Sequence, residues 1–479
     1  MKKIAVFVFI IVGAFLAAMI FSYVYVNEDR VSAYLNENLG EDFQVQIQSA
    51  SFNLINRSLA VDDISIQDLN SEENAPLFTA SKLSLKQIGL YKLLRGDINI
   101  GTVDLENGDL DIVTADNNSA RVYGINLNAG PIQYNSSDQF DGLSSIQNAV
   151  FQVDSVEYHF WEDRYRFRAE SLRLKENDSE FSAKRVRLEP AKSEDEYFQS
   201  FNYKTELFQV AVSDLMFTDI DFEGIRNGSN FNVRKMMFGS SDIHITVDKS
   251  MDEQPDREES PLPLEVLNNL PFQVNVDSLL FQGTDIRYSE YAEDGEKPGT
   301  IHFANTAASF TGIRSGSSDP VVFEATSYLE ETGEFNTRIE MSMDESGHLV
   351  DVRGKLGEFD ATRLNNIFMY LEGIRIKSGN VYDLEFYFQM NESCSAGSIL
   401  IHYDDLSIEK IDNVDLNSNF GDRIAGFFYD QVALRSGSEN NGQDAREGEI
   451  SREREPERSF FNNLWRSLRT GLLDVIKRL

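Results

Sequence analysis

Cysteine, histidine and basic residues are scarce in this sequence. Cys394 is the only cysteine among 479 residues, so the chain has no internal disulfide framework. It has five histidines, and none lies at a metal-ligand spacing such as H-E-x-x-H. Lysine and arginine total 44 against 79 aspartates and glutamates, which gives a net charge of −35. Because nucleic acid requires a basic footprint, we expect no nucleic-acid partner.

Motifs for catalysis and cofactor binding are also missing. The sequence has no nucleophile elbow, no phosphate-cradling glycine loop and no dinucleotide fingerprint. Acidic pairs such as Asp62-Asp63 are expected by composition on a solvated face, so they do not indicate glycosidase carboxylates. The densest polar cluster runs from His402 to Asp405, and it favours a strand end entering a turn over a metal site. The sequence therefore predicts a protein that is not an enzyme and has no cofactor or metal.

One long apolar run is present, at the N-terminus. Lys2 and Lys3 precede an uncharged stretch of 23 residues from Ile4 to Val26. As a helix it would be roughly 35 Å long, enough to cross a hydrocarbon core of about 30 Å. It exceeds the apolar core of a secretory signal, and no Ala-x-Ala site follows it, which favours an anchor that is kept. We expect residues 1–28 to be a transmembrane anchor with a cytoplasmic N-terminus and the bulk of the chain outside the cytoplasm.

After this run, apolar and polar residues alternate. Phe43, Val45 and Ile47 alternate with glutamines, and similar short runs separated by Asn, Asp, Ser and Gly follow along the chain. Strict alternation is typical of half-buried antiparallel strands. Helical spacing is confined to short stretches, chiefly Ile88–Arg95, Leu262–Leu270 and Asp360–Leu371. We therefore expect a mainly β fold, a long curved antiparallel sheet with few short helices.

Two segments of the strand-rich region resemble each other. Val103–Ile112 and Val276–Ile286 both begin with Val-Asp, contain a central glycine and end in Asp-Ile. Each predicts a strand, a tight turn and a second strand. Such a pair cannot bury its apolar face alone, so the units must stack into a longer sheet. The alternative is that the likeness is only the general likeness of β-hairpins.

Composition divides the remaining chain into segments. Residues 29–248 and 264–434 carry the strand pattern and predict two β regions. The acidic, proline-bearing stretch 249–263 predicts a loop between them. Residues 435–458 are rich in Ser, Gly, Asn, Glu and Arg, which predicts a flexible linker.

An amphipathic segment, residues 459–479, follows the linker. Its apolar helical face comprises Phe461, Leu464, Trp465, Leu468, Leu472 and Ile476. Its basic residues are Arg466, Arg469, Lys477 and Arg478, which against Asp474 leave a charge of +3. A basic amphipathic helix with Trp and Phe on its apolar side fits a membrane interface. Docking on the sheet or on an envelope protein partner is an equal alternative.

Three regions carry motifs in the order found in a known family. The first contains Leu39–Ile47, Leu83–Leu85 and Leu90–Leu105, read as strand, short helix, glycine and strand. The second is a hairpin from Gly283–Tyr288 to Ile301–Phe303. The third, from Gly354 to Leu406, includes a Leu-Asn helix at Leu364-Asn365, an Ile-x-Ser-Gly turn at Ile376–Gly379 and a Tyr-Asp strand at Tyr403. In this order they resemble the AsmA-like family of Gram-negative envelope proteins, relatives of TamB.

The resemblance implies a periplasmic protein anchored in the inner membrane by one helix. It implies a β-taco whose hydrophobic groove binds or transfers phospholipid or another acyl-chain ligand, in support of outer-membrane lipid homeostasis or assembly. It implies no catalytic residues. The candidate groove residues are Phe43, Val45, Ile47, Ile98, Ile100, Val103 and Leu105. A sealed, non-enzymatic scaffold for envelope assembly is the alternative, because periodicity does not distinguish an open trough from a closed sandwich.

Overall fold

The structure is a computed structural model that describes residues 43–69, 76–93, 98–113, 118–134, 148–226, 228, 230–254, 258–292, 297–344, 347–371, 373–411 and 445–477. The predicted anchor, residues 1–28, lies outside these ranges. Among the described residues, no helix combines the length and the apolar character needed to cross a bilayer.

The described chain is mainly β, as the alternation predicted. It divides into two compact units. Unit 1 holds the residues up to Arg187 together with Asp214–Asn230, and unit 2 holds Leu188–Ser213 together with Phe231 onward. Strands β10 (Glu180–Pro190) and β11 (Glu206–Ile220) have residues in both units. Twenty strands of the described residues belong to one hydrogen-bonded sheet, and β4 and β7 form a separate pair.

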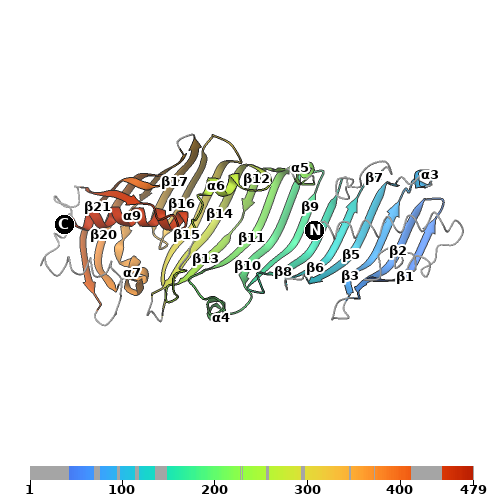
Figure 1. Cartoon of the computed structure of the whole chain (residues 1–479), viewed down its shortest axis with the longest axis horizontal. Helices are drawn as coiled ribbons and strands as arrows, with labels where there is room; N and C mark the ends of the chain where they lie inside the picture. Colours follow the sequence, from blue (N-terminus) through green and yellow to red (C-terminus); the bar gives the residue numbers. More distant parts are fainter. Residues whose placement is uncertain are drawn as a thin grey trace. The chain divides into compact units, whose positions relative to one another are not determined.

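In unit 1, successive strands of the main sheet pair antiparallel in the order β1–β2–β3–β5–β6–β8–β9 (Figure 1). The elements are β1 (Phe43–Asn53), β2 (Ser58–Asp68), β3 (Pro76–Lys86), α3 (Leu90–Leu93), β4 (Ile98–Ile100), β5 (Thr102–Val113), β6 (Ser119–Ala129), β7 (Ile132–Tyr134), β8 (Val150–Phe160), β9 (Tyr165–Lys175) and α5 (Phe222–Arg226).

In unit 2, β14–β15–β16–β17–β18–β20–β21–β22 pair antiparallel, and β11 pairs with β13. The elements are α4 (Glu194–Gln199), β12 (Asn230–Phe238), β13 (Ser241–Asp248), α6 (Pro263–Asn268), β14 (Gln273–Tyr291), β15 (Gly299–Arg314), β16 (Val321–Leu329), β17 (Gly333–Asp344), β18 (Gly347–Leu356), β19 (Phe359–Asp360), the 3-10 helix η1 (Ala361–Leu364), α7 (Asn365–Leu371), β20 (Ile374–Met390), β21 (Cys394–Lys410), β22 (Arg446–Glu453) and α9 (Phe460–Lys477).

The boundary between units differs from the one that composition suggested. Strand β13 pairs parallel with β14, with Asp242 opposite Asp285. The connection between these strands includes the stretch 249–263, so the strands on either side of it are neighbours in unit 2. A parallel pair requires a long crossover, which this connection supplies. The stretch therefore joins adjacent strands within unit 2, and the division falls at residues 188–230 instead. The parallel pair is also an exception to the antiparallel pattern expected.

The expected flexible linker at 435–458 is wrong for residues 446–453. These residues form β22, which pairs with β21 from Cys394 opposite Glu453 to Ile401 opposite Arg446. Polar composition misled the prediction because β22 alternates, and Gly448 and Ile450 are its buried residues. A strand with one apolar residue and a glycine on its inner face reads as a linker in sequence, although a neighbouring strand and helix cover that face. Residues 435–444 lie outside the described ranges.

Many of the long strands are bent by an interior residue with positive φ. In unit 1 these residues are Asp63, Asn107, Gly124, Ser171, Arg185 and Asp219, and in unit 2 they are Gly283, Asn305, Gly312 and Asp405. The pairings slip at several of these positions, as they do around Gly108 in β5 and between Phe281 and Ile286 in β14. Such β-bulges bend a strand and increase its twist.

Side chains from neighbouring strands satisfy the bulged backbone. The amide N–H of Asn107 donates to Oδ1 of Asn126 at 3.1 Å, and that of Gly124 donates to Oδ1 of Asp109 at 2.9 Å. In unit 2 the N–H of Asn305 donates to Oδ1 of Asp285 at 3.0 Å. Asp109 and Asp285 both follow the central glycine of their segment, by one and two residues. The shared glycine region is therefore a bulge within one continuous strand, and the expected tight turn between two strands is wrong.

The bulge at Gly124 generates a stability prediction. Gly124 has φ +66°, and a Cβ added there would lie 2.8 Å from Cβ of Asp154. Gly124→Ala should lower the free energy of unfolding by about 2–5 kcal/mol, the sum of left-handed strain and overpacking. Gly228→Ala is the matched control, because Gly228 has φ +65° and no atom within 4 Å of the added Cβ. It should cost only about 1–2 kcal/mol. Denaturant unfolding measures both, and equal losses would contradict the packed bulge.

Candidate functional site: two apolar sheet faces and a docked helix

One face of the unit 1 sheet carries an apolar row that crosses seven strands. We call it the apolar face of unit 1, and its directly paired residues are Ala50, Val61, Leu83, Leu105, Leu127, Phe151 and Leu174. Neighbouring residues on the opposite face, such as Gln152 and Arg173, are polar. Val61 and Leu83 are buried, whereas the row from Leu105 to Leu174 is only half-buried. The accessible part of this face therefore lies over β5, β6, β8 and β9.

The predicted groove residues mostly belong to the closed end of this face. Val45 and Ile100 are 1% and 0% exposed, and Val103 is also buried; all three share a core cluster with Ile66, Leu85 and Ile88. Ile47 and Leu105 pack against the same cluster. Phe43 begins β1 opposite Asp68 and is half-buried, and Ile98 begins β4 opposite Tyr134. The structure thus brings five of the seven predicted groove residues together. Three of them, Val45, Ile100 and Val103, lie in a core that is closed to solvent.

A second apolar face belongs to unit 2. Its paired row, the apolar face of unit 2, runs across eight strands and comprises Leu279, Phe310, Phe323, Ile339, Val352, Phe388, Gly397 and Ile450. From Ile339 onward the apolar side chains of the row are buried in one cluster that also contains Val350, Met390 and Ile399. This cluster includes Phe460 and Val475 of α9 and Leu262 at the start of α6, so both helices contribute to the cover.

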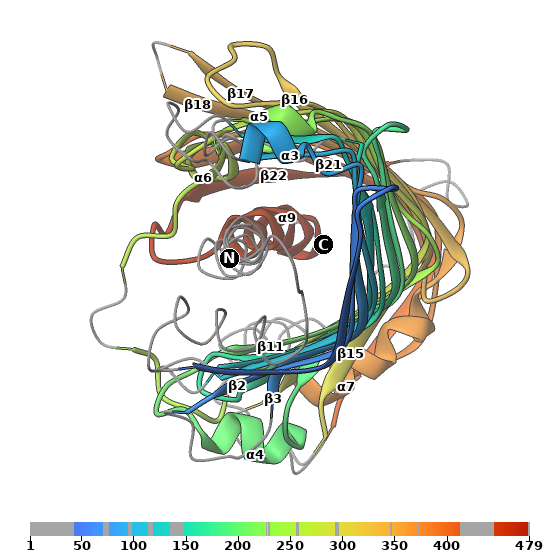
Figure 2. The ribbon, with the colours of Figure 1, turned by 90° about the vertical axis from the view of Figure 1, so that its right-hand side faces the viewer.

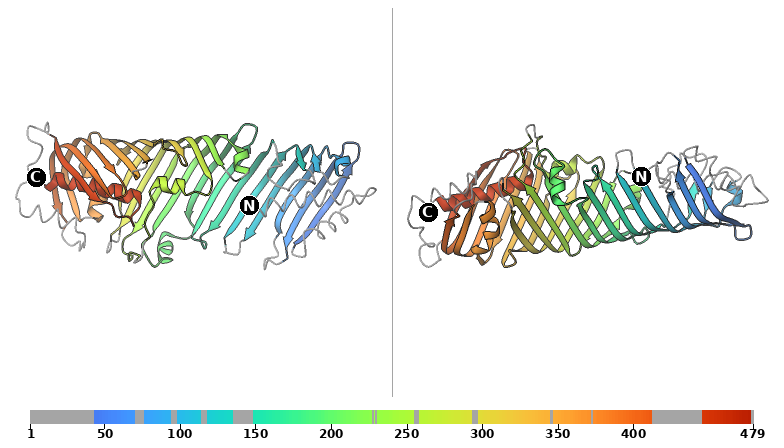
Figure 3. Two further views of the ribbon diagram at one scale, coloured as in Figure 1. Left: turned by 45° about the horizontal axis from the view of Figure 1, so that its top comes forward. Right: turned by 90° about the horizontal axis from the view of Figure 1, so that it is seen from below.

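Helix α9 lies on the apolar face of unit 2 (Figures 2 and 3). Phe460 and Val475 are buried in the cluster, and Leu464, Leu468 and Leu472 pack against it. Phe461 and Trp465 of the predicted apolar face are 71% and 48% exposed. Ile476 is the last apolar residue of that set and lies in the final turn of α9. Within the described residues, the predicted stripe is therefore split between a docked side and an exposed aromatic side.

The docked line of α9 consists of Phe460, Asn463, Ser467, Gly471 and Val475, all buried. At its centre the helix approaches the sheet closely. A Cβ added at Gly471 would lie 2.7 Å from Cγ1 of Ile450, and one added at Gly448 would overlap the carbonyl oxygen of Gly471. Sequence reasoning passed over this line because its centre is polar or small. The spacing of 3, 4, 4 and 4 residues between its members is the signal that would have found it.

A buried hydroxyl pair fixes the register of the helix on the sheet. Oγ of Ser467 donates to the carbonyl oxygen of Asn463 at 2.8 Å, so it accepts the hydroxyl of Ser395 from β21 at 2.6 Å. Both serines are buried. The N–H of Glu449 in β22 also donates to Oδ2 of Asp474 at 2.8 Å. Because a buried polar group without a partner is costly, these bonds specify one position of the helix.

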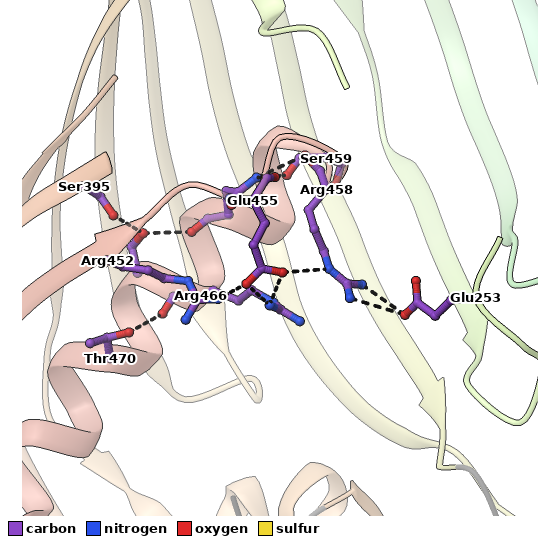
Figure 4. Close-up of polar contacts among 10 residues, drawn as sticks. Glu253, Ser395, Arg452, Glu455, Arg458, Ser459, Arg466 and Thr470 are labelled. Carbon is purple, nitrogen blue, oxygen red and sulfur yellow. Dashed lines mark hydrogen bonds and ion pairs between the residues drawn. The ribbon is translucent and has the colours of Figure 1, made fainter. Parts of the chain in front are cut away.

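Charged residues hold the start of α9, and we call them the Glu455 clasp (Figure 4). The Glu455 carboxylate accepts from Arg452, from Arg458 at 3.2 Å and from Arg466 at 2.6 Å. Arg458 also reaches Glu253 at 3.3 Å, so the clasp extends to the β13–α6 loop. The N–H of Ser260 in that loop donates to the carbonyl oxygen of Pro456 at 2.8 Å.

The clasp shifts the pKa values of its members. Burial disfavours the carboxylate of Glu455, but Arg466, Arg458 and Arg452 together outweigh burial and hold the pKa of Glu455 below its ordinary value of 4.5. Burial and the neighbouring Arg458 lower the pKa of Arg466. Glu455 is therefore ionised at neutral pH and gathers three cations.

The predicted basic residues of α9 do not form one separate face. Arg466 is bound in the clasp, and Arg469 lies in the middle of the helix with interactions of its own. Lys477 ends the helix, and Arg478 lies outside the described residues. Glu455, which the sequence placed in a linker, is the main partner of this charge.

The opposite face of the unit 2 sheet has a shallow open depression of about 1090 Å³. Its cations are neutralised locally. Lys355 pairs with Glu385 at 2.6 Å, Arg338 pairs with Glu324 and Glu340, and the guanidinium of Arg353 lies 5.1 Å from the ring centre of Tyr387. Because Lys355 and Arg338 already pair with carboxylates and Arg353 lies against an aromatic ring, the depression is a weaker candidate than the apolar faces.

The polar cluster around His402 does not assemble a metal site. His402 Nδ1 lies 2.6 Å from Oδ1 of Asp383, and Asp404 accepts from Tyr382 at 2.6 Å and from Asn380 at 3.1 Å. Across the described ranges, no group of three or more His, Cys, Asp or Glu residues is placed to hold a metal ion. Cys394 is exposed with a free thiol.

Comparison with known proteins adds no relative: no family model and no curated protein matches the chain.

The clasp generates a pH prediction. A carboxylate whose pKa is lowered by docking stabilises the docked state above pH 4.5, and this contribution is lost as pH falls through the lowered pKa. With Trp161→Phe, Trp465 is the only tryptophan, and its emission should move to longer wavelength as acid releases the helix. Glu455→Gln should show part of this shift already at neutral pH, and the acid transition should shrink.

Glu457→Gln is the matched control, because Glu457 is exposed two residues away and its substitution removes the same charge. It should keep the acid transition of the parent. Identical emission profiles for Glu455→Gln and Glu457→Gln would contradict the clasp.

Proposed function

We propose that this protein binds acyl chains of phospholipid along the apolar face of unit 1 and passes them along its sheet, as a membrane-tethered lipid-binding or lipid-transfer protein. The observation that carries the proposal is the half-buried row from Leu105 to Leu174. It is apolar on four adjacent strands, while the other side of the same strands carries mainly polar residues. A contiguous apolar surface on an otherwise charged protein is suited to an apolar ligand.

The location belongs to the same proposal. The apolar run at Ile4–Val26 supports a single inner-membrane anchor with the bulk of the chain in the periplasm, and the order of motifs supports a role in outer-membrane lipid homeostasis or assembly. The net charge of −35 disfavours a body that lies flat on anionic lipid. Lipid would therefore reach the sheet as single molecules, with acyl tails on the apolar face and the head group at its edge.

The second candidate is a non-enzymatic scaffold for envelope assembly. The sealed cluster around Val45 and Ile100 favours it, as does the helix that covers the apolar face of unit 2. A scaffold predicts that surface changes, and not changes on the apolar row, remove function. Lipid extraction from the purified full chain separates the two candidates, because phospholipid near one or more molecules per chain supports binding and its absence supports the scaffold.

A substitution in the half-buried row tests whether this face binds lipid. Phe151→Glu places a charge among the acyl chains and should lower the amount of phospholipid bound by about tenfold, the factor that corresponds to 1.4 kcal/mol. Gln152→Glu is the matched control, because the next residue of β8 points to the other face of the sheet and receives the same charge. Native mass spectrometry measures occupancy, and circular dichroism verifies folding.

Equal occupancy in the two variants would contradict lipid binding on this face. Val45 and Ile100 are poor positions for the same test, because a charge at a residue with 1% or 0% exposure would unfold the core.

A further inference from the structure

The apolar face of unit 2 has the same construction as the accessible face of unit 1, but its own chain covers it. The covered residues include Val352, Phe388 and Ile399, which are 0–1% exposed. These residues share one cluster with Phe460 and Val475 of α9 and with Leu262 at the start of α6, and Leu464, Leu468 and Leu472 of α9 pack against it. The side chains that α9 contributes are hydrocarbon, the chemistry that an acyl chain would offer in the same place.

The length of α9 is sufficient for an acyl chain to take its place on the apolar face of unit 2. Helix α9 has 18 residues and is therefore about 27 Å long. An acyl chain occupies one leaflet, about half of a hydrocarbon core of about 30 Å. The helix thus covers more than the length of one acyl chain.

The contact between helix and sheet also contains polar and small residues, whose polar groups water can satisfy. Asn463, Ser467 and Gly471 occupy the centre of the docked line, where a permanent core would have large apolar side chains. The start of the helix is held by the Glu455 clasp, whose ionic side chains are 27–35% exposed. Exposed ion pairs contribute little individually and are screened by salt. Release of α9 therefore leaves few unpaired polar groups on either partner.

Away from the sheet, α9 has the aromatic side chains that suit a membrane interface. Phe461 and Trp465, one turn apart, are exposed on its other side. In addition, α9 follows β22, whose pairing within the described residues is with β21. The helix is thus attached at the last strand of the unit, where its departure disturbs the fewest pairings.

We propose that the apolar face of unit 2 beneath α9 is a second acyl-chain site, which the docked helix occupies in the absence of lipid. The proposal rests on the proposed function, since it concerns the same ligand. Acyl chains and α9 then compete for Val352, Phe388 and Ile399, and displacement of the helix opens the site. The Ser395–Ser467 hydroxyl pair marks the closed position.

A reversible lock tests the competition. Ser395→Cys with Ser467→Cys, in a Cys394→Ser background, should form a disulfide in the docked state, because the two Oγ atoms are 2.6 Å apart. The full chain is placed in phosphatidylcholine vesicles with a fatty acid that carries a photoreactive diazirine. After illumination, mass spectrometry locates the labelled residues. Ser467→Cys alone in the same background is the control for oxidant and reductant.

In the oxidised double variant, labels are expected on the apolar face of unit 1, and β18, β20 and β21 should carry only the small amount due to molecules without the disulfide. Reduction should raise labelling of those three strands by about tenfold, as expected when the disulfide holds about nine molecules in ten closed. Glu455→Gln, in a chain that keeps Cys394, Ser395 and Ser467, should raise the labelling of β18, β20 and β21 without any reductant. Labelling of unit 1 should be unchanged throughout.

Other outcomes overturn the proposal. Unit 2 labelling that is equal with and without the disulfide means that α9 does not compete with acyl chains. Labels confined to unit 1 in both states overturn the second site but leave the proposed function intact. Labels on neither unit overturn both. A folded double variant that forms no disulfide on oxidation overturns the docked position of the helix.

Discussion

The constraint on which this structure depends is that a sheet with one apolar face must cover that face or offer it to something else. Both units are built from long strands whose alternate residues are apolar, so each pairing extends the apolar row by one residue. Paired strands also satisfy their backbone groups, which leaves the apolar row as the main surface still in need of a partner. Unit 1 closes one end of its row with the core around Val45 and Ile100. Unit 2 closes part of its row with its own C-terminal helix.

β-Bulges bend the long strands, and polar side chains satisfy the backbone at several of these bends. A residue with positive φ inside a strand would normally leave an amide without a partner. Asn126, Asp109 and Asp285 accept from the amides of Asn107, Gly124 and Asn305, so these three bends carry no unsatisfied donor. The abundance of Asn and Asp within the strands, which is unusual for β structure, therefore has a structural role. The carboxylates of the aspartates also contribute to the acidic charge of the chain.

The two ways of closing the apolar rows differ in chemistry. The core around Val45 is apolar throughout and has the character of a permanent interior. The contact beneath α9 combines apolar side chains with a hydroxyl pair, a buried asparagine and the Glu455 clasp. Polar groups at a buried contact favour one precise position over maximal stability. The unit 1 core therefore suits a structural role, and the α9 contact is the place proposed for competition with another apolar partner.

Alternation along the sequence was sufficient to predict the mainly β fold, because the period of two is a local property of a half-buried strand. The helices near residues 90, 263 and 365 were predictable for the same reason, from local spacing. Three features required the tertiary structure. The parallel pairing of β13 with β14 depends on residues that are 43 positions apart. The strand β22 exists because β21 and α9 lie beside it, although its composition is that of a linker. The docked line of α9 runs through Gly471 and Ser467, and not through the most apolar residues. The helix lies so close to the sheet there that only small side chains fit.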